Sequence, residues 1–318
     1  MKILVTGSCG YKGTVLVPKL LDAGHEVIAF DIMWFGNFLK EHPKLKVVKG
    51  DVCDISSVPI EGVDAIIHLS SVANDPCSDL DPKLTWEISC LATMQLADRA
   101  ARMGIKRFIY ASSGSVYGLK DEPQVTEDLE LVPLSEYNKT KMVAERVLLS
   151  YSDRMVVQIV RPATVCGISP RMRFDVAVNL LTIQALSKGI ITVLGGDQTR
   201  PNIHIDDITD LYLYFIDNPQ VNGVFNAGFE NLTIMRIAEI ISKKTNANIS
   251  ILPSNDPRSY RVSSVKLLSA GFKPKKTVEN AIEEICFSFQ NGLLKNEDCN
   301  YNLKWMQMMP QYSYKNKI

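Results

Sequence analysis

The sequence predicts a doubly wound α/β fold, in which helices cover both faces of a parallel sheet, with a smaller α/β lobe after it. In the first half of the chain, short apolar strand segments alternate with amphipathic helical segments, and the strands are continuously apolar, as in a sheet buried on both faces. A glycine-rich turn joins the first strand to the first helix. The 318 residues, 46% of them hydrophobic and 22% charged, suffice for one large domain or two modest ones.

The first domain is predicted from repeated strand–helix–strand units, which produce parallel strand pairing. Its strands are the short apolar runs at 3–5, 27–30, 47–48, 65–69, 108–110 and 156–160. Helices are expected at 86–103 and 137–151, where apolar residues return every three or four positions. We place this domain at residues 1–165, completed by residues from about 200–225.

The rest of the chain predicts a second lobe at residues 166–292 and a tail at 293–318. The lobe's expected elements are a loop at 161–173, helices near 174–188, 234–243 and 278–289, and short strands near 191–194 and 224–227. The tail carries Trp305, Met306, Met308 and Met309, which can pack on the body or on a neighbour. We expect a loosely docked terminus.

Composition excludes several classes of function. Thirty-five Lys and Arg balance 35 Asp and Glu, so no global field recruits nucleic acid or an anionic membrane. The seven cysteines are scattered without a C-x-x-C pair and the four histidines stand singly, which argues against a metal site and for a reducing compartment. The N-terminus reads as a strand and a turn, and no apolar run is long enough to span a bilayer. We therefore expect a cytoplasmic protein.

The turn after the first strand has the pattern of a dinucleotide-binding loop. Gly7, Gly10 and Gly13, with Tyr11 and Lys12 between them, permit a tight turn and close approach of a pyrophosphate to the N-terminus of a helix. This context predicts a Rossmann-type domain.

The end of the second strand predicts which dinucleotide binds. Asp31, followed by Ile32, lies about 20 residues after the glycine loop, where a carboxylate can accept hydrogen bonds from ribose hydroxyls and repel a 2′-phosphate. NAD is therefore favoured over NADP, and the alternative is that Asp31 only caps a turn.

Ser113, Tyr137 and Lys141 are the predicted catalytic residues. Tyr137 and Lys141 are four residues apart on a helix and so share one face, which places an ammonium beside a phenol. A cation favours the phenolate, and such a tyrosine can take a proton from a sugar hydroxyl while hydride leaves for the cofactor.

Taken together, these motifs resemble the extended short-chain dehydrogenases/reductases that act on nucleotide sugars. The resemblance rests on the glycine loop, the strand end 110–118, the Tyr137–Lys141 pair and Arg161-Pro162, and it extends to about residue 290. It implies that Ser113 positions the reacting hydroxyl or ketone, Tyr137 is the acid/base and Lys141 holds the nicotinamide ribose. It also implies cofactor contacts from three further segments: Asp51 and Val52; Leu69, Ser70 and Ser71; and Pro162 and Thr164.

The resemblance assigns substrate contacts mainly to the second lobe. Ser115, Asn179, Arg200 and Arg258 fall where relatives contact the nucleotide sugar, and guanidinium groups suit a diphosphate. For each arginine the alternative is a surface ion pair. His204 and Asp207 are expected to be structural, with His204 buried on a strand and Asp207 capping the following helix.

Departures from the family pattern narrow the expected reaction. Dehydratases carry an Asp-Glu pair after the catalytic Ser or Thr, whereas this chain has Gly114-Ser115, and the cysteine of 3,5-epimerising relatives is absent. Cys9 and Cys166 are interpreted as packing residues. Ser89 stands where many relatives have an asparagine near the cofactor, so one hydrogen bond to the substrate or cofactor is in doubt.

Chemistry at a single carbon remains, most simply C4 of a nucleotide-activated sugar. The reaction is then a 4-epimerisation, a C4 dehydrogenation or, in reverse, a 4-keto-sugar reduction. The segment 161–175 looks like the branch in bacterial capsule and lipopolysaccharide pathways, which implies GDP-heptose or a related precursor. A non-catalytic NAD-binding scaffold and oxidation of a steroid or flavonoid alcohol are the alternatives. The resemblance also implies a homodimer that pairs through the helices at 86–103 and 137–151.

Overall fold

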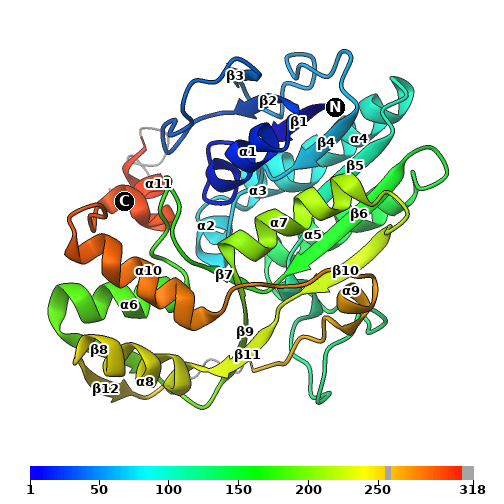
Figure 1. Ribbon diagram of the computed structural model, residues 1–318. Helices are drawn as coiled ribbons and strands as arrows, with labels where there is room; N and C mark the ends of the chain where they lie inside the picture. The colour runs from blue at the N-terminus through cyan, green and yellow to red at the C-terminus, as the bar shows by residue number, and fades with distance from the viewer. Residues whose placement is uncertain (255–258, 310–318) are drawn as a thin grey trace.

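Seven parallel strands form the central sheet of a computed structural model, which describes residues 1–254 and 259–309 (Figure 1). Their spatial order is β10-β6-β5-β4-β1-β2-β3. The strands are β1 Lys2–Thr6, β2 Glu26–Asp31, β3 Leu45–Lys49, β4 Ala65–His68, β5 Arg107–Ala111, β6 Val156–Pro162 and β10 Gly223–Ala227. The strand order reverses between β1 and β4, which is where ligands bind in such sheets. The predicted fold class is confirmed.

The central strands are buried on both faces, as expected, but the edge strand β3 is not, since Val47 is 37% exposed. Ile3 and Val5 belong to one apolar cluster and Leu4 to a second, because alternate side chains of a strand point to opposite faces. The first cluster contains α1 (Gly13–Asp22) and α7 (Ile205–Asp217), which lie side by side on one face of the sheet (Figure 1). The second contains α4 (Ala92–Arg102) and α5 (Glu136–Leu149) on the other face.

The segment 86–103, expected to be one helix, contains the end of α3 (Pro82–Trp86), a π-helical turn at Glu87–Leu91 and α4. A further short helix, α2 (Asp75–Leu80), precedes α3. Within the turn, the buried Ser89 hydroxyl lies 3.0 Å from Ser71 Oγ and accepts a hydrogen bond from the Val72 amide at 3.2 Å. A π-turn adds a residue to the helix, and here it brings Ser89 to the loop after β4.

The second lobe is built around three helices with their own apolar cluster. These are α6 (Ala177–Lys188), α8 (Ile234–Thr245) and α10 (Val278–Gln290). A two-stranded sheet and a three-stranded sheet accompany them, made of β8 (Ile190–Leu194) and β12 (Asn248–Leu252), and of β7 (Thr164–Cys166), β9 (Thr199–His204) and β11 (Glu230–Thr233). Between these elements the chain returns to the central sheet to form α7 and β10, and after β12 it adds the short helix α9 (Val265–Ser269).

The C-terminal segment packs on the body, so the expectation of a loosely docked terminus is wrong for its described part. After a 3-10 turn at Asp298–Asn300, α11 spans Asn302–Met308. Met306 is 2% exposed in the cluster that contains α4 and α5. The Trp305 indole N–H donates to the Trp34 carbonyl at 2.7 Å. These apolar and polar contacts together fix the segment.

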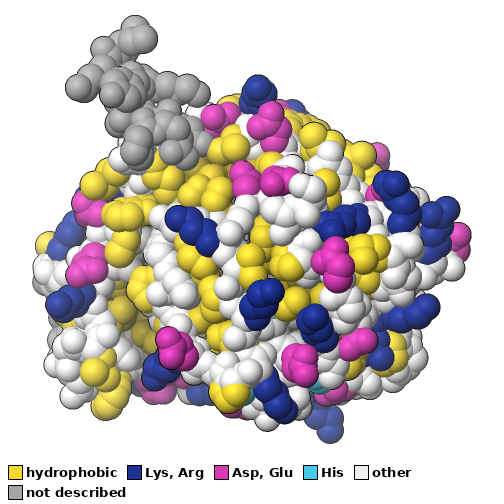
Figure 2. Space-filling model, turned by 90° about the horizontal axis from the view of Figure 1, so that it is seen from above, with side chains coloured by type: hydrophobic (Ala, Val, Ile, Leu, Met, Phe, Trp, Pro, Cys, Tyr) yellow, Lys and Arg dark blue, Asp and Glu magenta, His cyan; other side chains and the backbone are white. Residues whose placement is uncertain are grey.

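Charges of both signs are intermixed on the face of the molecule seen in Figure 2. This agrees with the balanced composition of the chain. Among the described residues, no helix combines the length and the apolar character needed to cross a bilayer.

Candidate active site

A cavity of about 390 Å³ lies at the carboxyl ends of the central strands and collects nearly all of the predicted site residues. The predicted residues that line it are Gly7, Gly10, Tyr11, Lys12, Gly13, Asp31, Ile32, Asp51, Val52, Leu69, Ser70, Ser71, Ser113, Ser115, Tyr137, Lys141, Pro162, Thr164 and Arg200. Asn179 does not line it, and Arg258 lies outside the described residues.

The glycine loop forms a close-packed cradle that side chains would fill. Gly7 has φ +67°, and a Cβ there would lie 2.7 Å from the Ser70 amide nitrogen. A Cβ on Gly13 would lie 2.6 Å from the Gly7 carbonyl oxygen. Burial and the charge of Arg173 lower the pKa of the adjacent Lys12 to about 8. Glycine backbone without side chains, next to the positive charge of Lys12, fits the pyrophosphate of a dinucleotide.

Asp31 is held firmly at the end of β2. Its carboxylate accepts hydrogen bonds from the amides of Cys9 at 2.9 Å and Met33 at 2.6 Å. Burial raises the pKa of this carboxyl, which the two amides oppose. Each oxygen retains acceptor capacity toward the cavity. Hydrogen bonding of Asp31 to ribose hydroxyls stays a prediction.

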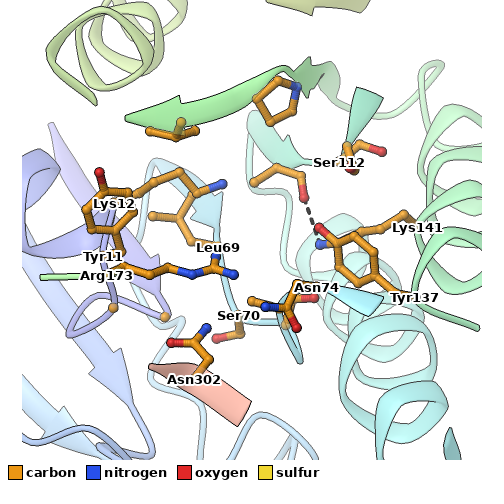
Figure 3. A pocket seen from close by; sticks show the side chains of 18 of the residues that line it. Tyr11, Lys12, Leu69, Ser70, Asn74, Ser112, Tyr137, Lys141, Arg173 and Asn302 are labelled. Atoms are coloured by element: carbon orange, nitrogen blue, oxygen red, sulfur yellow. Dashed lines mark hydrogen bonds between the residues drawn. The ribbon is translucent and has the colours of Figure 1, made fainter. Parts of the chain in front are cut away.

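The predicted catalytic residues Ser113, Tyr137 and Lys141 line the same cavity. Figure 3 shows Tyr137 and Lys141 together on the side of the cavity opposite Tyr11 and Lys12. Helix α5 begins after Ser135, whose hydroxyl accepts from the Asn138 amide at 3.2 Å, and it carries Tyr137 and Lys141 on one face. Lys141 Nζ donates to the Ala111 carbonyl at 2.8 Å and lies 5.9 Å from the centre of the Tyr137 ring. Tyr137 and Lys141 therefore share one face of α5, and the catalytic roles of Ser113, Tyr137 and Lys141 stay predictions.

Burial and neighbouring groups change the pKa values of both Tyr137 and Lys141. Burial raises the pKa of Tyr137, while a hydrogen bond with Ser113 and the charge of Arg173 oppose the rise. Burial and the charge of Lys12 lower the pKa of Lys141 to about 7. In the cofactor-free protein the two pKa values therefore move apart, and the phenol of Tyr137 keeps its proton at neutral pH.

A buried ion pair between Glu145 and Arg161 connects α5 to β6. Glu145, which is 1% exposed, accepts from Arg161 Nε at 3.0 Å and from Arg161 Nη2 at 2.7 Å. The Ser112 hydroxyl also donates to Glu145, and Arg161 Nη1 donates to the Tyr117 hydroxyl at 2.7 Å. This network ties the end of β5, which precedes Ser113, to the helix that carries Tyr137.

Several lining residues were not predicted as site residues. The cations Arg171 and Arg173 lie in the segment 161–175, which the sequence analysis names without assigning them a role in the site. No sequence pattern marks Asn302 or Asn74, which has φ +80°, as a site residue. Asn302 reaches the cavity from the C-terminal segment (Figure 3). Only tertiary structure brings a residue so distant in sequence to this site.

Asn179 is buried and braces the loop after β7 instead of lining the cavity. Its side-chain oxygen accepts from the Gly167 amide at 3.0 Å. Its amide nitrogen donates to the Tyr11 hydroxyl at 3.0 Å and to the Arg173 carbonyl at 2.9 Å. Asn179 therefore links the glycine loop to the arginine-containing loop.

The roles of His204 and Asp207 differ in part from expectation. His204 is buried, as expected, but it is His204 and not Asp207 that caps α7, through its Nδ1 and the Asp206 amide at 3.1 Å. Asp207 instead accepts from the backbone amides of Lys275 and Lys276 at 2.8 and 3.1 Å.

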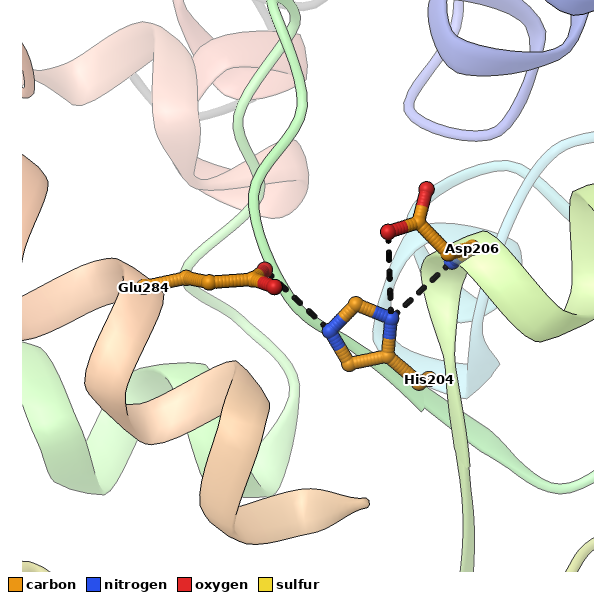
Figure 4. Close-up of side chains that lie close together, drawn as sticks. All are labelled: His204, Asp206 and Glu284. Atoms are coloured by element: carbon orange, nitrogen blue, oxygen red, sulfur yellow. Dashed lines mark hydrogen bonds and ion pairs between the residues drawn. The ribbon is translucent and has the colours of Figure 1, made fainter. Parts of the chain in front are cut away.

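Two carboxylates flank His204 (Figure 4). Its Nε2 lies 3.2 Å from Glu284, and Asp206 lies on the side of Nδ1. Glu284 is paired with Lys276 at 2.8 Å and Asp206 with Lys19 at 2.9 Å. The Lys19–Asp206 ion pair joins α1 to α7, and the contact of His204 with Glu284 connects them to α10.

Comparisons with known proteins agree with this geometry. Residues 3–228 match the model of the NAD dependent epimerase/dehydratase family. The chain is 30% identical over 259 residues to the uncharacterized protein y4nG of Sinorhizobium fredii, covering 79% of this chain but 62% of that protein. It is 27% identical over 317 residues to UDP-glucuronic acid decarboxylase 1 of Arabidopsis thaliana, covering 94% of this chain and 72% of that one.

A solved structure also resembles the whole molecule. The UDP-glucuronic acid 4-epimerase of Bacillus cereus, in complex with UDP-glucuronic acid and NAD, superposes with a TM-score of 0.79 at 26% identity, covering 92% of this chain and 100% of that one. The expectations of an enzyme and of NAD as its cofactor are thereby confirmed at the level of the family. The chain belongs to the NAD dependent epimerase/dehydratase family.

Proposed function

We propose that this protein oxidises C4 of a nucleotide-activated sugar and reduces the resulting ketone again, as a 4-epimerase does. A C4 dehydrogenase that releases the ketone, and a 4-ketoreductase that starts from it, use the same site. The observation that carries the proposal is the convergence of Ser113, Tyr137 and Lys141 at one end of a cavity whose other end fits a dinucleotide.

The side chains divide the proton chemistry among them. NAD, when bound, supplies the two-electron oxidant for C4. The Ser113 hydroxyl, linked to Ser115 Oγ at 2.7 Å, orients the C4 hydroxyl. Tyr137 accepts the proton from that hydroxyl and returns it when the ketone is reduced. Lys141 stabilises the phenolate by its charge.

Water elimination is less well supported than epimerisation. It needs an acid and a base beyond the tyrosine, but Gly114 is buried and the Ser115 hydroxyl donates to Asn138. Among the described residues that line the cavity near Tyr137, the acidic group is Asp75, which already accepts a hydrogen bond from Ser135 at 2.5 Å. This arrangement favours chemistry confined to C4.

The lining of the cavity and the relatives both support a nucleotide-sugar substrate. Arg200 lines the cavity from the second lobe, where a guanidinium suits a diphosphate. A steroid or flavonoid alcohol would have no use for this cation. Oxidation at C4 also places a ketone β to a C6 carboxylate, which is the requirement for losing carbon dioxide from a hexuronic acid. A single first step therefore serves a 4-epimerase and a decarboxylase alike.

The test is turnover of a panel of UDP, dTDP, CDP and GDP sugars that includes UDP-glucose, UDP-glucuronic acid and a GDP-heptose. Absorbance of the reduced nicotinamide and mass and NMR spectra of the product are recorded together. An isomeric product without net cofactor reduction identifies a 4-epimerase, and a product two hydrogens lighter identifies a dehydrogenase. Absence of turnover with every sugar, together with intact NAD binding, would favour the non-catalytic scaffold.

A further inference from the structure

We propose that the C-terminal segment, residues 298–309, is part of the cofactor site and holds the adenosine half of NAD through Arg171. This inference goes beyond the proposed function, because it concerns how the cofactor is retained and not which sugar reacts. Three groups of contacts carry it.

The first group joins the segment to the loop after β2. Asn302, labelled in Figure 3, lines the cavity. Asp31, Trp34 and Phe35 line the same cavity. The Trp305 indole N–H donates to the Trp34 carbonyl at 2.7 Å. Since Asp31 marks the end of the cavity where the adenosine ribose is expected, the segment closes this end and not the catalytic end.

The second group concerns Arg171, which is 3% exposed. Its Nη2 donates to the Asn302 side-chain oxygen at 2.6 Å, and its guanidinium carbon lies 3.8 Å from the centre of the Phe35 ring. Its Nε has no acceptor among the described residues. A buried guanidinium N–H beside a cavity calls for an acceptor. We assign that role to an oxygen of the adenosine half of the dinucleotide.

The third group fixes the segment to the loop that carries Arg171. The backbone N–H of Asn302 donates to the Asp175 carboxylate at 3.2 Å, and the backbone N–H of Phe174 donates to the Asn300 backbone carbonyl at 2.8 Å. Met306 is buried against the central domain. The segment thus contacts both the loop after β2 and the loop that carries Arg171, so releasing it loosens the orientation of Arg171.

The test measures cofactor binding in Asn302→Ala and Trp305→Phe. Asn302→Ala removes the side-chain acceptor of Arg171. Trp305→Phe removes the hydrogen bond to the Trp34 carbonyl and keeps an aromatic ring at this position. Met308→Ala, on the 56% exposed side of the same helix, is the matched control. Dissociation constants for NAD, ADP-ribose and UDP are measured by calorimetry, and the NAD release rate by stopped-flow fluorescence.

We expect Asn302→Ala to weaken NAD and ADP-ribose about 10-fold, as for a lost hydrogen bond to a charged group, with faster NAD release. Trp305→Phe should show a smaller loss, and UDP binding and the control should stay within about 2-fold of the parent. Unchanged NAD and ADP-ribose affinity in a folded Asn302→Ala overturns the proposal, as does an equal loss of UDP affinity. Failure of the parent to turn over any sugar would contradict the proposed function but leave this binding test intact.

Discussion

At the scale of residues, Tyr137, the proposed acid/base, lies among groups that act on its pKa in opposite directions. Burial disfavours the phenolate of Tyr137, while Ser113 and the charge of Arg173 favour it. Lys141 is itself near the point of losing its proton, because burial and Lys12 lower its pKa to about 7. Small changes in charge near the cavity are therefore expected to change activity.

Replacing the tyrosine tests its role directly. Tyr137→Phe removes the acid/base but keeps the ring, so turnover should fall about 10²–10⁴-fold. NAD affinity should remain within about 2-fold, since the lost hydroxyl contributes at most a modest hydrogen bond. Steady-state kinetics and calorimetry measure the two quantities, with Tyr151→Phe, just beyond α5, as the control. Turnover at the parental rate in Tyr137→Phe would remove Tyr137 from the mechanism.

The pKa of Lys141 makes a second prediction. In the cofactor-free protein, NMR of its ammonium group should report a value of about 7, which rises in Lys12→Met because a neighbouring positive charge is removed. The folded value lies below the unfolded one, so the unfolded chain binds more protons between about pH 7 and about pH 10.5, and this lysine contributes stability that grows as pH rises. A pKa near 10.5 in the parent, or no rise in Lys12→Met, would contradict this account.

At the scale of elements, α5 is positioned by the Glu145–Arg161 pair. Both side chains are at most 6% exposed, and the pair is bidentate. It joins α5 to β6, and Ser112 joins the same carboxylate to β5. The spacing between Ser113 and Tyr137 therefore depends on a buried charge pair.

Breaking this pair should be costly. Arg161→Met leaves the Glu145 carboxylate buried without its cation, so the free energy of unfolding in urea should fall by about 3–5 kcal/mol. The double variant Arg161→Met with Glu145→Gln should recover part of the loss. Lys139→Ala, which breaks an exposed pair with Glu136 on the same helix, should cost less than about 1 kcal/mol. A loss in Arg161→Met no larger than in Lys139→Ala would show that the buried pair does not anchor α5.

The sequence was sufficient to predict those elements whose signals are local. The glycine loop, the apolar strands and the Tyr137–Lys141 spacing each follow from short-range patterns, and the structure contains them. The π-turn at Glu87–Leu91 was not predicted, because it depends on the contact of Ser89 with the loop after β4. Asn302 was missed for the same reason, since its partner Arg171 is distant in the chain.

At the scale of the whole molecule, the cavity lies where the strand order reverses and where the second lobe meets the sheet. The central domain contributes the glycine loop and α5, and the lobe contributes Arg200. In the proposed function, the central domain binds the cofactor and the lobe selects the sugar nucleotide.

A homodimer through α4 and α5 stays a prediction at this scale. Leu91, at the end of the π-turn, and Met94, in α4, are 49% and 36% exposed. Leu91→Glu should convert a dimer into a monomer in size-exclusion chromatography with light scattering. Leu293→Glu, at a 74% exposed position elsewhere, should leave the mass unchanged. A parent that is monomeric at micromolar concentration would contradict the dimer.

The most direct measurement follows a deuterium label placed at C4 of the sugar nucleotide that the panel identifies. Our account predicts that the label leaves C4 during turnover and returns to C4 with inverted configuration, or stays on the cofactor if the ketone is released. Both outcomes should be lost in Tyr137→Phe. A product altered elsewhere in the sugar, with deuterium still at C4 in its original configuration and no isotope effect on the rate, would contradict oxidation at C4.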